Sequence, residues 1–362
     1  MIIVRIIGFV VGAMLGIMTI LAALRTVVMP RAENVWLTRW LFQLLRVGLF
    51  DMLVARAESY QDRDRLMAYF APLGVFLLPT AWLTSLSVSY ALMFWGIGHG
   101  TLFESFVQSG SSMLTLGYRP VETLPEVLLS FTASGLGLIL ITLMISYLPA
   151  MYSAFSKREE AVARLEVRAG DPPTSWEMLL RYHNLGRLDR LDEIWERWER
   201  WFVELAETHT SLAPLVHFRS PEPHHSWVTA SGAVLDAAVL RASVLDLPRS
   251  VDAEVMIRAG YIALRRIASF FNLPFDPLPA GDDPISIDQR EFDAIYDQLK
   301  EAGLPIKPDR EQAWREFSGW RVNYDQVLIG LAALTMAPYA PWSSDRSFVQ
   351  PRYFNRIPRD TA

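Results

Sequence analysis

Residues 127–156 read VLLSFTASGLGLILITLMISYLPAMYSAFS and contain no charged side chain. A helix needs about 20 apolar residues to cross the hydrocarbon core of a bilayer, and a longer run leaves room for tilt or protrusion. Soluble helices rarely stay uncharged over such a length. This run therefore predicts a membrane-spanning helix, in preference to the buried helix of a soluble protein.

Two further uncharged runs precede it, at residues 6–24 and 71–98, and both are long enough to span a bilayer. The first run follows only Arg5 and lacks a small-x-small cleavage site, so we interpret it as an anchor helix and not as a signal peptide. Residues 1–156 carry 9 Lys or Arg and 8 Asp or Glu, and residues 157–362 carry the other 25 and 31 of the chain's 34 and 39. The sequence therefore predicts three spanning helices followed by a soluble, mildly acidic region.

The composition also excludes several classes of function. The chain has no cysteine, which excludes disulfides, iron–sulfur clusters, thiolate zinc sites and cysteine nucleophiles. Its net charge of −5 provides no basic field for nucleic acid. A phosphate-binding glycine loop, a G-x-S-x-G elbow and paired catalytic carboxylates are all missing from the sequence. We therefore expect no enzyme, no cofactor, no metal site and no nucleic-acid partner.

The connection between the first two runs contains a helix pattern at residues 32–65. Arg39, Gln43 and Arg46 form one polar stripe on an otherwise apolar segment. Such a helix suits the membrane surface, where its arginines meet lipid headgroups. A fourth spanning helix is the alternative, and the sequence leaves open whether the segment spans or lies on the membrane.

The arginines of this connection predict the topology of a multi-pass protein of the cell (inner) membrane. Positively charged loops stay in the cytoplasm. The arginines concerned are Arg25, Arg31, Arg39, Arg46, Arg56, Arg63 and Arg65. The N-terminus and the connection at residues 99–126 are then external, and residues 157–362 are cytoplasmic. One arginine and three glutamates in the 99–126 connection agree with an external position.

The external connection reads HGTLFESFVQSGSSMLTLGYRPVETLPE, and its middle is too apolar for an ordinary loop. A helix of roughly 13 residues there would be about 20 Å long, enough to dip into the bilayer without crossing it. Irregular backbone at that depth persists only where protein or water lines it. The segment thus predicts a re-entrant helix followed by the tetrapeptide Thr115-Leu116-Gly117-Tyr118.

This arrangement resembles the pore-loop family of potassium channels, whose filter signature is Thr-Val-Gly-Tyr-Gly. The resemblance covers residues 66–156, which would supply an outer helix, a pore helix, a filter and an inner helix. It implies a homotetramer in which carbonyl oxygens from four chains replace the hydration shell of a monovalent cation, K⁺ in the family. The alternative is a coincidental tetrapeptide in an external loop.

The resemblance also assigns roles to single residues. The filter would comprise Thr115, Leu116, Gly117, Tyr118 and Arg119, with the Tyr118 ring packed behind it. Glu122 and Glu126 would lie at the pore mouth, and the inner helix would bend at Gly135 and Gly137. Packing between helices through small residues is the alternative explanation for these two glycines.

Three positions depart from the family pattern. Arg119 replaces the second glycine, Pro120 replaces the aspartate that often follows, and Leu114 replaces the threonine usual before the filter. Arg119 would place four guanidinium groups near the mouth, which leaves the ion selectivity open. The alternative is that Arg119 pairs with Glu122 or Glu126 and only braces the loop.

The region after Ser156 is expected to be helical, beginning with the polar linker Lys157-Arg158-Glu159-Glu160. Asp252 and Ser286 are possible helix starts, and Gly186 and Gly303 possible ends. A tryptophan stripe at 195, 198 and 201 predicts a core face or a subunit contact. His209, His217, His224 and His225 accompany Glu222 in a spacing that matches no ligand pattern. The predicted helices cover residues 175–208, 230–246, 251–271, 288–302, 308–318 and 323–337.

Together these patterns predict an all-α membrane protein in three parts. Residues 1–65 form an anchor helix and an interfacial helix, residues 66–156 the pore domain, and residues 157–362 a helical cytoplasmic domain. The leading function is a tetrameric, potassium-channel-like cation channel gated through its cytoplasmic domain. The alternative is a non-conducting membrane receptor or scaffold that recruits a cytoplasmic partner. The sequence specifies neither the gating stimulus nor the cytoplasmic ligand.

Overall fold

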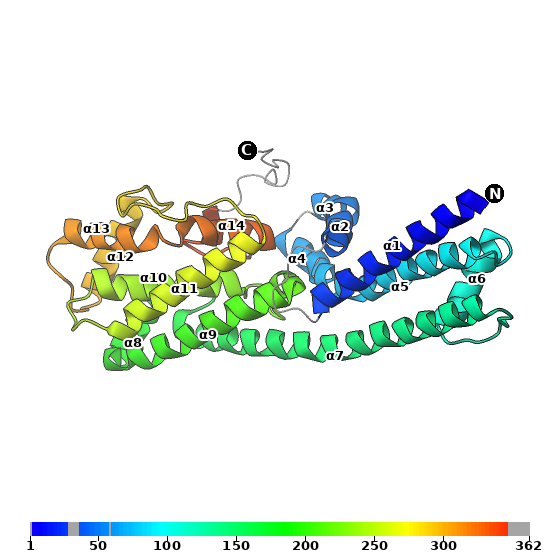
Figure 1. Ribbon diagram of the computed structural model, residues 1–362. Helices are drawn as coiled ribbons and strands as arrows, with labels where there is room; N and C mark the ends of the chain where they lie inside the picture. Colours follow the sequence, from blue (N-terminus) through cyan, green and yellow to red (C-terminus); the bar gives the residue numbers. More distant parts are fainter. Residues whose placement is uncertain (1, 28–35, 58, 347–362) are drawn as a thin grey trace. The chain divides into compact units, whose positions relative to one another are not determined.

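The computed structural model describes residues 2–27, 36–57 and 59–346, and every regular element in these ranges is a helix (Figure 1). The one β-contact among them is an isolated antiparallel bridge between Leu245 and Ile306. The predicted all-α class is therefore confirmed. The chain forms two compact units, one of the residues up to Ala154 with Ser211–Phe218, and one of Phe155–Thr210 with the residues from Arg219 onward.

Three helices are long and apolar enough to cross a membrane, as the uncharged runs predict. They are α1 (Ile2–Val27), the continuous stretch Tyr60–Gly96 formed by α4 (Tyr60–Ala68) and α5 (Phe70–Gly96), and α7 (Leu124–Ala169). The polar linker at Lys157 is part of α7, which continues without a break through these charged residues to Ala169. Helix-forming glutamates, arginines and alanines follow the apolar run there, and Gly170, with φ of +82°, ends the helix.

The first unit is built on close packing of α1 against α5 (Figure 1). Gly8, Gly12 and Gly16 lie on one face of α1, and a Cβ at Gly12 would come within 2.6 Å of the Ser89 carbonyl oxygen. The Ser89 hydroxyl donates to the Gly12 carbonyl at 2.7 Å. This G-x-x-x-G spacing lets two helix backbones approach closely. α1 is therefore a packed part of the unit.

The connection between α1 and α5 is helical but divided. It contains α2 (Trp36–Leu45), the π-helical turn η1 (Arg46–Phe50), α3 (Asp51–Ala55) and α4. The Arg46 guanidinium lies 5.7 Å from the centre of the Phe70 ring and pairs with Asp51 at 2.9 Å. Part of the predicted interfacial stretch lies outside the described residues, namely residues 32–35, Glu58 and the side chains of Trp36, Leu37 and Arg39, and so does Arg31 of the topology prediction.

The second unit is a bundle around α10 (Trp227–Ser243), which contacts α8, α11, α13 and α14 (Figure 1). Almost every side chain of α10 is buried, and the tryptophan stripe of α9 is buried too, so the predicted core face is confirmed. The 3-10 turn η3 (Ala213–His217) belongs to the first unit. The other elements are α8 (Ser175–Asn184), η2 (Leu188–Arg190), α9 (Leu191–Ser211), α11 (Val251–Phe270), α12 (Gln289–Glu301), α13 (Arg310–Arg321), α14 (Asp325–Thr335) and η4 (Ser344–Arg346).

Two predicted helix starts are wrong by two residues. α11 is capped by Ser250, whose hydroxyl accepts from the Ala253 amide, and α12 by Asp288, which forms a reciprocal capping box with Glu291. A side-chain acceptor two or three residues before a free amide satisfies the helix end, and these residues have that position. Gly186 and Gly303 confirm the predicted ends, with φ of +66° and +82°.

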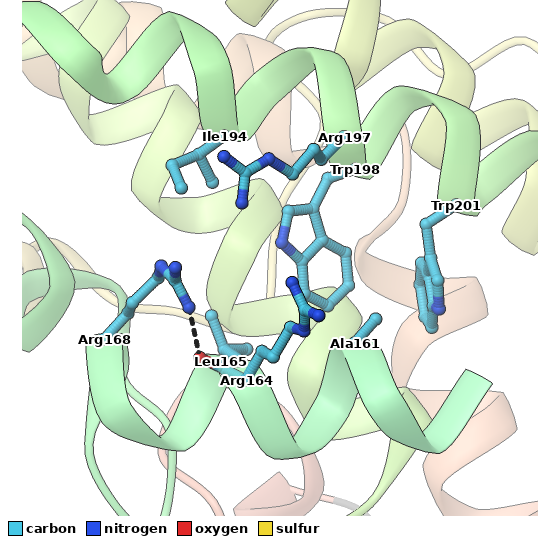
Figure 2. Close-up of a pocket in the computed structure, with 8 residues that line it drawn as sticks. All are labelled: Ala161, Arg164, Leu165, Arg168, Ile194, Arg197, Trp198 and Trp201. Atoms are coloured by element: carbon cyan, nitrogen blue, oxygen red, sulfur yellow. Dashed lines mark hydrogen bonds between the residues drawn. The ribbon is translucent and has the colours of Figure 1, made fainter. Parts of the chain in front are cut away.

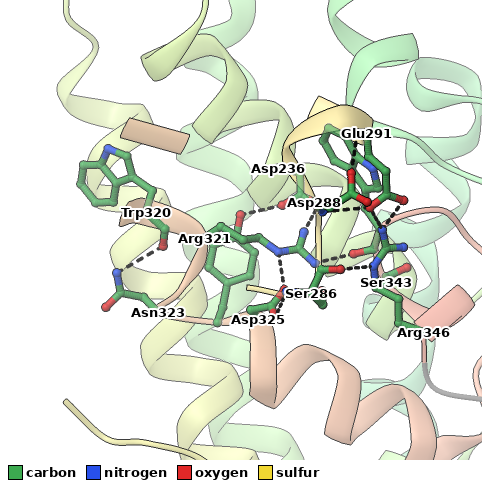
Figure 3. Close-up of polar contacts among 12 residues, drawn as sticks. Asp236, Ser286, Asp288, Glu291, Trp320, Arg321, Asn323, Asp325, Ser343 and Arg346 are labelled. Atoms are coloured by element: carbon green, nitrogen blue, oxygen red, sulfur yellow. Dashed lines mark hydrogen bonds and ion pairs between the residues drawn. The ribbon is translucent and has the colours of Figure 1, made fainter. Parts of the chain in front are cut away.

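A buried ion network joins α10, α13, α14 and the segment after α14 (Figure 3). Arg321 is fully buried, contacts Asp236 and the Trp342 carbonyl, and donates to Asp325 at 2.9 Å. The Tyr324 hydroxyl donates to Asp236 at 2.6 Å. Burial opposes the charge on Arg321, yet the fields of Asp236 and Asp325 raise its pKa above the usual range.

Candidate functional site: the loop between α6 and α7

Helix α6 (Leu102–Met113) occupies the predicted position between α5 and α7 and begins with a capping box. The Thr101 hydroxyl accepts from the Glu104 amide at 3.3 Å, and the Thr101 amide donates to the Glu104 carboxylate at 2.7 Å. The hydrogen bond from the Thr101 backbone lowers the pKa of Glu104. Twelve residues make a helix of about 18 Å, too short to cross a bilayer.

The faces of α6 are reversed relative to a helix of a soluble protein. Its buried side chains are mainly polar: Ser105, Gln108, Ser109, Ser111, Ser112 and Met113. On the opposite face, Phe103 is 73% exposed and Phe106 is 48% exposed. A soluble helix normally buries its apolar face and exposes its polar one. This helix instead presents an apolar surface outward and keeps its hydroxyl groups inside the unit.

Hydroxyl groups of α6 tie it to both neighbouring helices. Ser109 donates to the Ser87 carbonyl of α5 at 2.8 Å, and Ser112 lies 3.0 Å from the Ser130 hydroxyl of α7. Ser134 of α7 donates to the Ser112 carbonyl at 2.6 Å. These bonds fix the C-terminal end of α6, from which the filter-like residues continue.

The backbone of residues 114–119 folds back over the end of α6. The amides of Leu116 and Gly117 donate to the Ser111 carbonyl at 2.9 and 3.2 Å, and the Arg119 amide donates to the Ser111 hydroxyl at 3.3 Å. Thr115 and Gly117 have left-handed backbone angles, with φ of +56° and +65°. Glycine adopts this conformation without strain, whereas a β-branched threonine does so at a cost.

The carbonyl oxygens of this loop are unpaired. Within the described residues, none of the carbonyls of residues 114–119 accepts a hydrogen bond. In a planar trans peptide a C=O points opposite to the N–H of the next residue. Since the amides of Leu116, Gly117 and Arg119 point to Ser111, the carbonyls of Thr115, Leu116 and Tyr118 point away from α6. The loop therefore presents several free oxygens on one side.

The side chains of the loop are exposed within a single chain. Leu116 is 61% exposed and Tyr118 is 60% exposed. The described residues of the same chain therefore cover less than half of the Tyr118 side chain. A Cβ at Gly117 would meet no atom within 4 Å, so the backbone angle of Gly117, and not space, selects glycine there.

The acidic residues after the loop have partners other than Arg119. The Glu126 carboxylate lies 2.7 Å from His99 Nδ1 and accepts from the amides of Glu122 and Thr123 at 3.0 and 3.1 Å. Within the described residues, Arg119 forms no ion pair with Glu122 or Glu126, and its role stays a prediction. The contact with His99 was not foreseen, because nothing local in the sequence links residues so far apart.

The two glycines of the predicted inner-helix bend have different surroundings. A Cβ at Gly137 would lie 2.3 Å from the Met113 carbonyl oxygen, so Gly137 allows α7 to pack on the end of α6. Gly135 has no atom within 4 Å of that position. Both lie inside the unbroken helix α7, and the bend remains a prediction.

The four histidines considered as metal ligands do not come together. His209 is buried in α9 beside Arg158, with 3.3 Å between His209 Nε2 and a guanidinium nitrogen. His217 packs its ring on Phe70 in the first unit, and His224 is exposed. His225 contacts Glu166, which the sequence pattern did not suggest.

A groove in the second unit combines arginines with tryptophans (Figure 2). Figure 2 shows Arg164 on one helix of the groove, and Arg197 and Trp198 on the facing helix. Arg168 also lines the groove and has no carboxylate partner within the part of the chain that the structure describes. The sequence pattern shows Arg164 and Arg168 on one helix face but gives no indication that α9 packs beside them.

No protein-family model matches the chain, and no curated protein or solved structure matches it either. What the loop does is therefore inferred from its own residues and geometry.

Proposed function

We propose that the chain is the subunit of a homotetrameric, potassium-channel-like cation channel of the cell membrane. In this proposal α5 is the outer helix, α6 the pore helix, residues 115–119 the filter and the apolar part of α7 the inner helix. One pore loop per chain requires four chains to close a filter around one axis. The chain itself has no enzymatic role in the proposal.

The observation that carries the proposal is the set of carbonyls of Thr115, Leu116 and Tyr118. Within the described residues they accept no hydrogen bond, and they point away from α6 in a loop between two long apolar helices. Carbonyl oxygens are the ligands with which a filter replaces the hydration shell of a cation. The left-handed angle of Gly117 supports the same reading, because it turns successive peptide planes. The exposed rings of Tyr118 and Phe103 would then be covered by neighbouring subunits or by lipid.

The reversed faces of α6 support a place within the bilayer. Phe103 and Phe106 point their apolar surface outward, while the serine hydroxyls are satisfied inside the unit. Backbone outside a helix is tolerated at membrane depth only where protein or water surrounds it. The arginine asymmetry between loops supports a cytoplasmic position for residues 25–65 and for the second unit, with the N-terminus outside.

Single-channel recording in planar bilayers, with K⁺ and Na⁺ on opposite sides, tests the proposal. We expect Gly117→Ala to abolish conduction while leaving the tetramer intact on native gels, because the added Cβ opposes the left-handed angle. Gly110→Ala is the matched control, since Gly110 is helical and a Cβ there meets no atom within 4 Å. Wild-type currents in Gly117→Ala, or a chain that runs only as a monomer or dimer, would refute the channel.

The groove of Figure 2 favours a second candidate, a non-conducting receptor or scaffold that recruits an acidic cytoplasmic partner. Its guanidinium groups can bind carboxylates, and the Trp198 ring offers an apolar contact. A chain that carries no current but binds poly-glutamate, and binds it more weakly as Arg168→Gln, supports the receptor. Absence of such binding together with conduction supports the channel.

A further inference from the structure

Three possible metal ligands from separate segments of the second unit lie together. Glu166 belongs to the last turns of α7, Asp171 to the turn after α7, and His225 to the segment before α10. Each offers one ligand atom, and these atoms all lie within 4.8 Å of one another. The His225 side chain is only 9% exposed, whereas the Glu166 side chain is 49% exposed and free to adjust.

The backbone around these residues is fixed by hydrogen bonds. The Gly170 amide donates to the Glu166 carbonyl, and the Thr174 amide to the Ala169 carbonyl, both at 2.9 Å. The His225 amide donates to the Glu222 carbonyl at 3.1 Å. Ser226, the next residue, caps α10. The three ligands are therefore presented by an ordered turn and an ordered helix start.

The distance between His225 and Glu166 matches the spacing of two ligands on one ion, and it also lies within the range of an ion pair. Nε2 of His225 lies 3.3 Å from a carboxylate oxygen of Glu166. Charge-assisted hydrogen bonds are about 2.7–2.9 Å long, as in the 2.7 Å contact of His99 with Glu126. Two ligands of a tetrahedral zinc ion with bonds of about 2.0–2.2 Å lie roughly 3.4 Å apart.

The charge of the three side chains also favours the binding of a cation. Two carboxylates beside one imidazole leave a net negative charge, which a divalent cation would offset. The imidazole nitrogen favours zinc and related first-row metals, whereas Mg²⁺ and Ca²⁺ prefer ligand sets made only of oxygen. The Asp171 carboxylate is exposed, and its ligand atom lies within 4.8 Å of those of Glu166 and His225.

We propose that Glu166, Asp171 and His225 bind one Zn²⁺ ion per chain, with water in the fourth position. The ion ties the end of α7 to the segment that leads into α10. This inference is independent of conduction, because it concerns only residues of the second unit.

Isothermal titration of the full-length chain in detergent, stripped with EDTA and titrated with zinc chloride, tests the site. We expect one zinc ion per chain and no comparable binding of Mg²⁺. His225→Gln should weaken zinc binding by more than about 100-fold, since loss of even an outer partner costs 10–100-fold. His224→Gln, which changes the adjacent exposed histidine, is the matched control and should bind zinc as the wild type does.

Two further variants keep the test decisive if His225→Gln does not fold. Glu166→Gln and Asp171→Asn change exposed side chains, and each should also weaken zinc binding. In the wild type, added zinc should raise the melting temperature in a concentration-dependent manner. Zinc binding that survives all three ligand variants, or is lost equally in His224→Gln, would overturn the site.

Discussion

Replacement of Arg321 by methionine is expected to destabilise the second unit strongly. Arg321 is fully buried, and its two carboxylate partners, Asp236 and Asp325, are 2% and 4% exposed. Removing one partner of a buried ion pair costs about 3–5 kcal/mol, because the other charge stays buried without compensation. Two carboxylates lose their cation here, but each keeps another hydrogen bond, from Tyr324 or from Ser286. We therefore expect about 4 kcal/mol, a large share of the 5–15 kcal/mol typical of a domain.

Urea unfolding of the full-length chain in detergent, followed by near-ultraviolet circular dichroism, measures this effect. With a slope of about 1–3 kcal/mol/M, the loss of about 4 kcal/mol corresponds to a midpoint shift of roughly 1.3–4 M. Arg315→Met is the control on the same helix, and its exposed side chain should change stability by less than about 0.5 kcal/mol. The unfolding midpoint of Arg321→Lys should lie between those of Arg321→Met and Arg315→Met, because lysine keeps the positive charge and lacks the planar guanidinium group. Equal midpoints for Arg321→Met and Arg315→Met would show that the network does not hold the unit together.

Three other expectations concern the proposed filter, a buried histidine and the topology. Arg119→Gly should raise K⁺ conductance or K⁺/Na⁺ preference, most visibly at low salt where external charges are least screened, whereas Arg119→Lys should not; identical recordings for all three chains would contradict this role. Burial and the neighbouring Arg158 hold the pKa of His209 well below its usual value. As the pH falls, the unfolded chain therefore binds a proton at His209 that the folded chain does not bind. Stability should therefore be complete above about pH 6.5 and fall below it, and melting curves of His209→Gln should lose that decline; the same decline in both chains would exclude His209 as its source. A reporter fused after residue 170 should be cytoplasmic, and an external reporter would contradict the proposed orientation.

The helices were predictable because their signals are local. Uncharged runs identify α1, α5 and α7 directly, and the spacing of Trp195, Trp198 and Trp201 identifies the buried face of α9. Errors at helix starts were small, since several polar residues near Ser250 could each have served as a cap. The sequence does contain an indication that α1 packs closely on another helix, because the four-residue spacing of Gly8, Gly12 and Gly16 permits close contact between helices.

Contacts between distant segments were not predictable in the same way. The histidines were grouped because they are neighbours in sequence, but His225 meets Glu166 and Asp171 of another segment, and His217 packs in the other unit. The pairing of Glu126 with His99 is of the same kind. Local patterns determine which face of a helix is buried, whereas the partner of that face depends on how the helices are connected and packed.

The loop after α6 gives the strongest physical reason to expect a partner at this site. Thr115 adopts a left-handed angle that costs a β-branched residue about 1–3 kcal/mol, and such strain persists only where surrounding contacts impose it. The hydrogen bonds from the amides of Leu116, Gly117 and Arg119 to Ser111 of α6 impose this strained conformation. These three amides are therefore not available to bind another group. Within the described residues the carbonyls of Thr115, Leu116 and Tyr118 have no donor, and a loop at the proposed membrane depth would require water, an ion or a neighbouring subunit to satisfy them. Loss of conduction in Gly117→Ala with intact assembly would connect this backbone geometry to ion passage, because the added Cβ opposes the left-handed angle of Gly117.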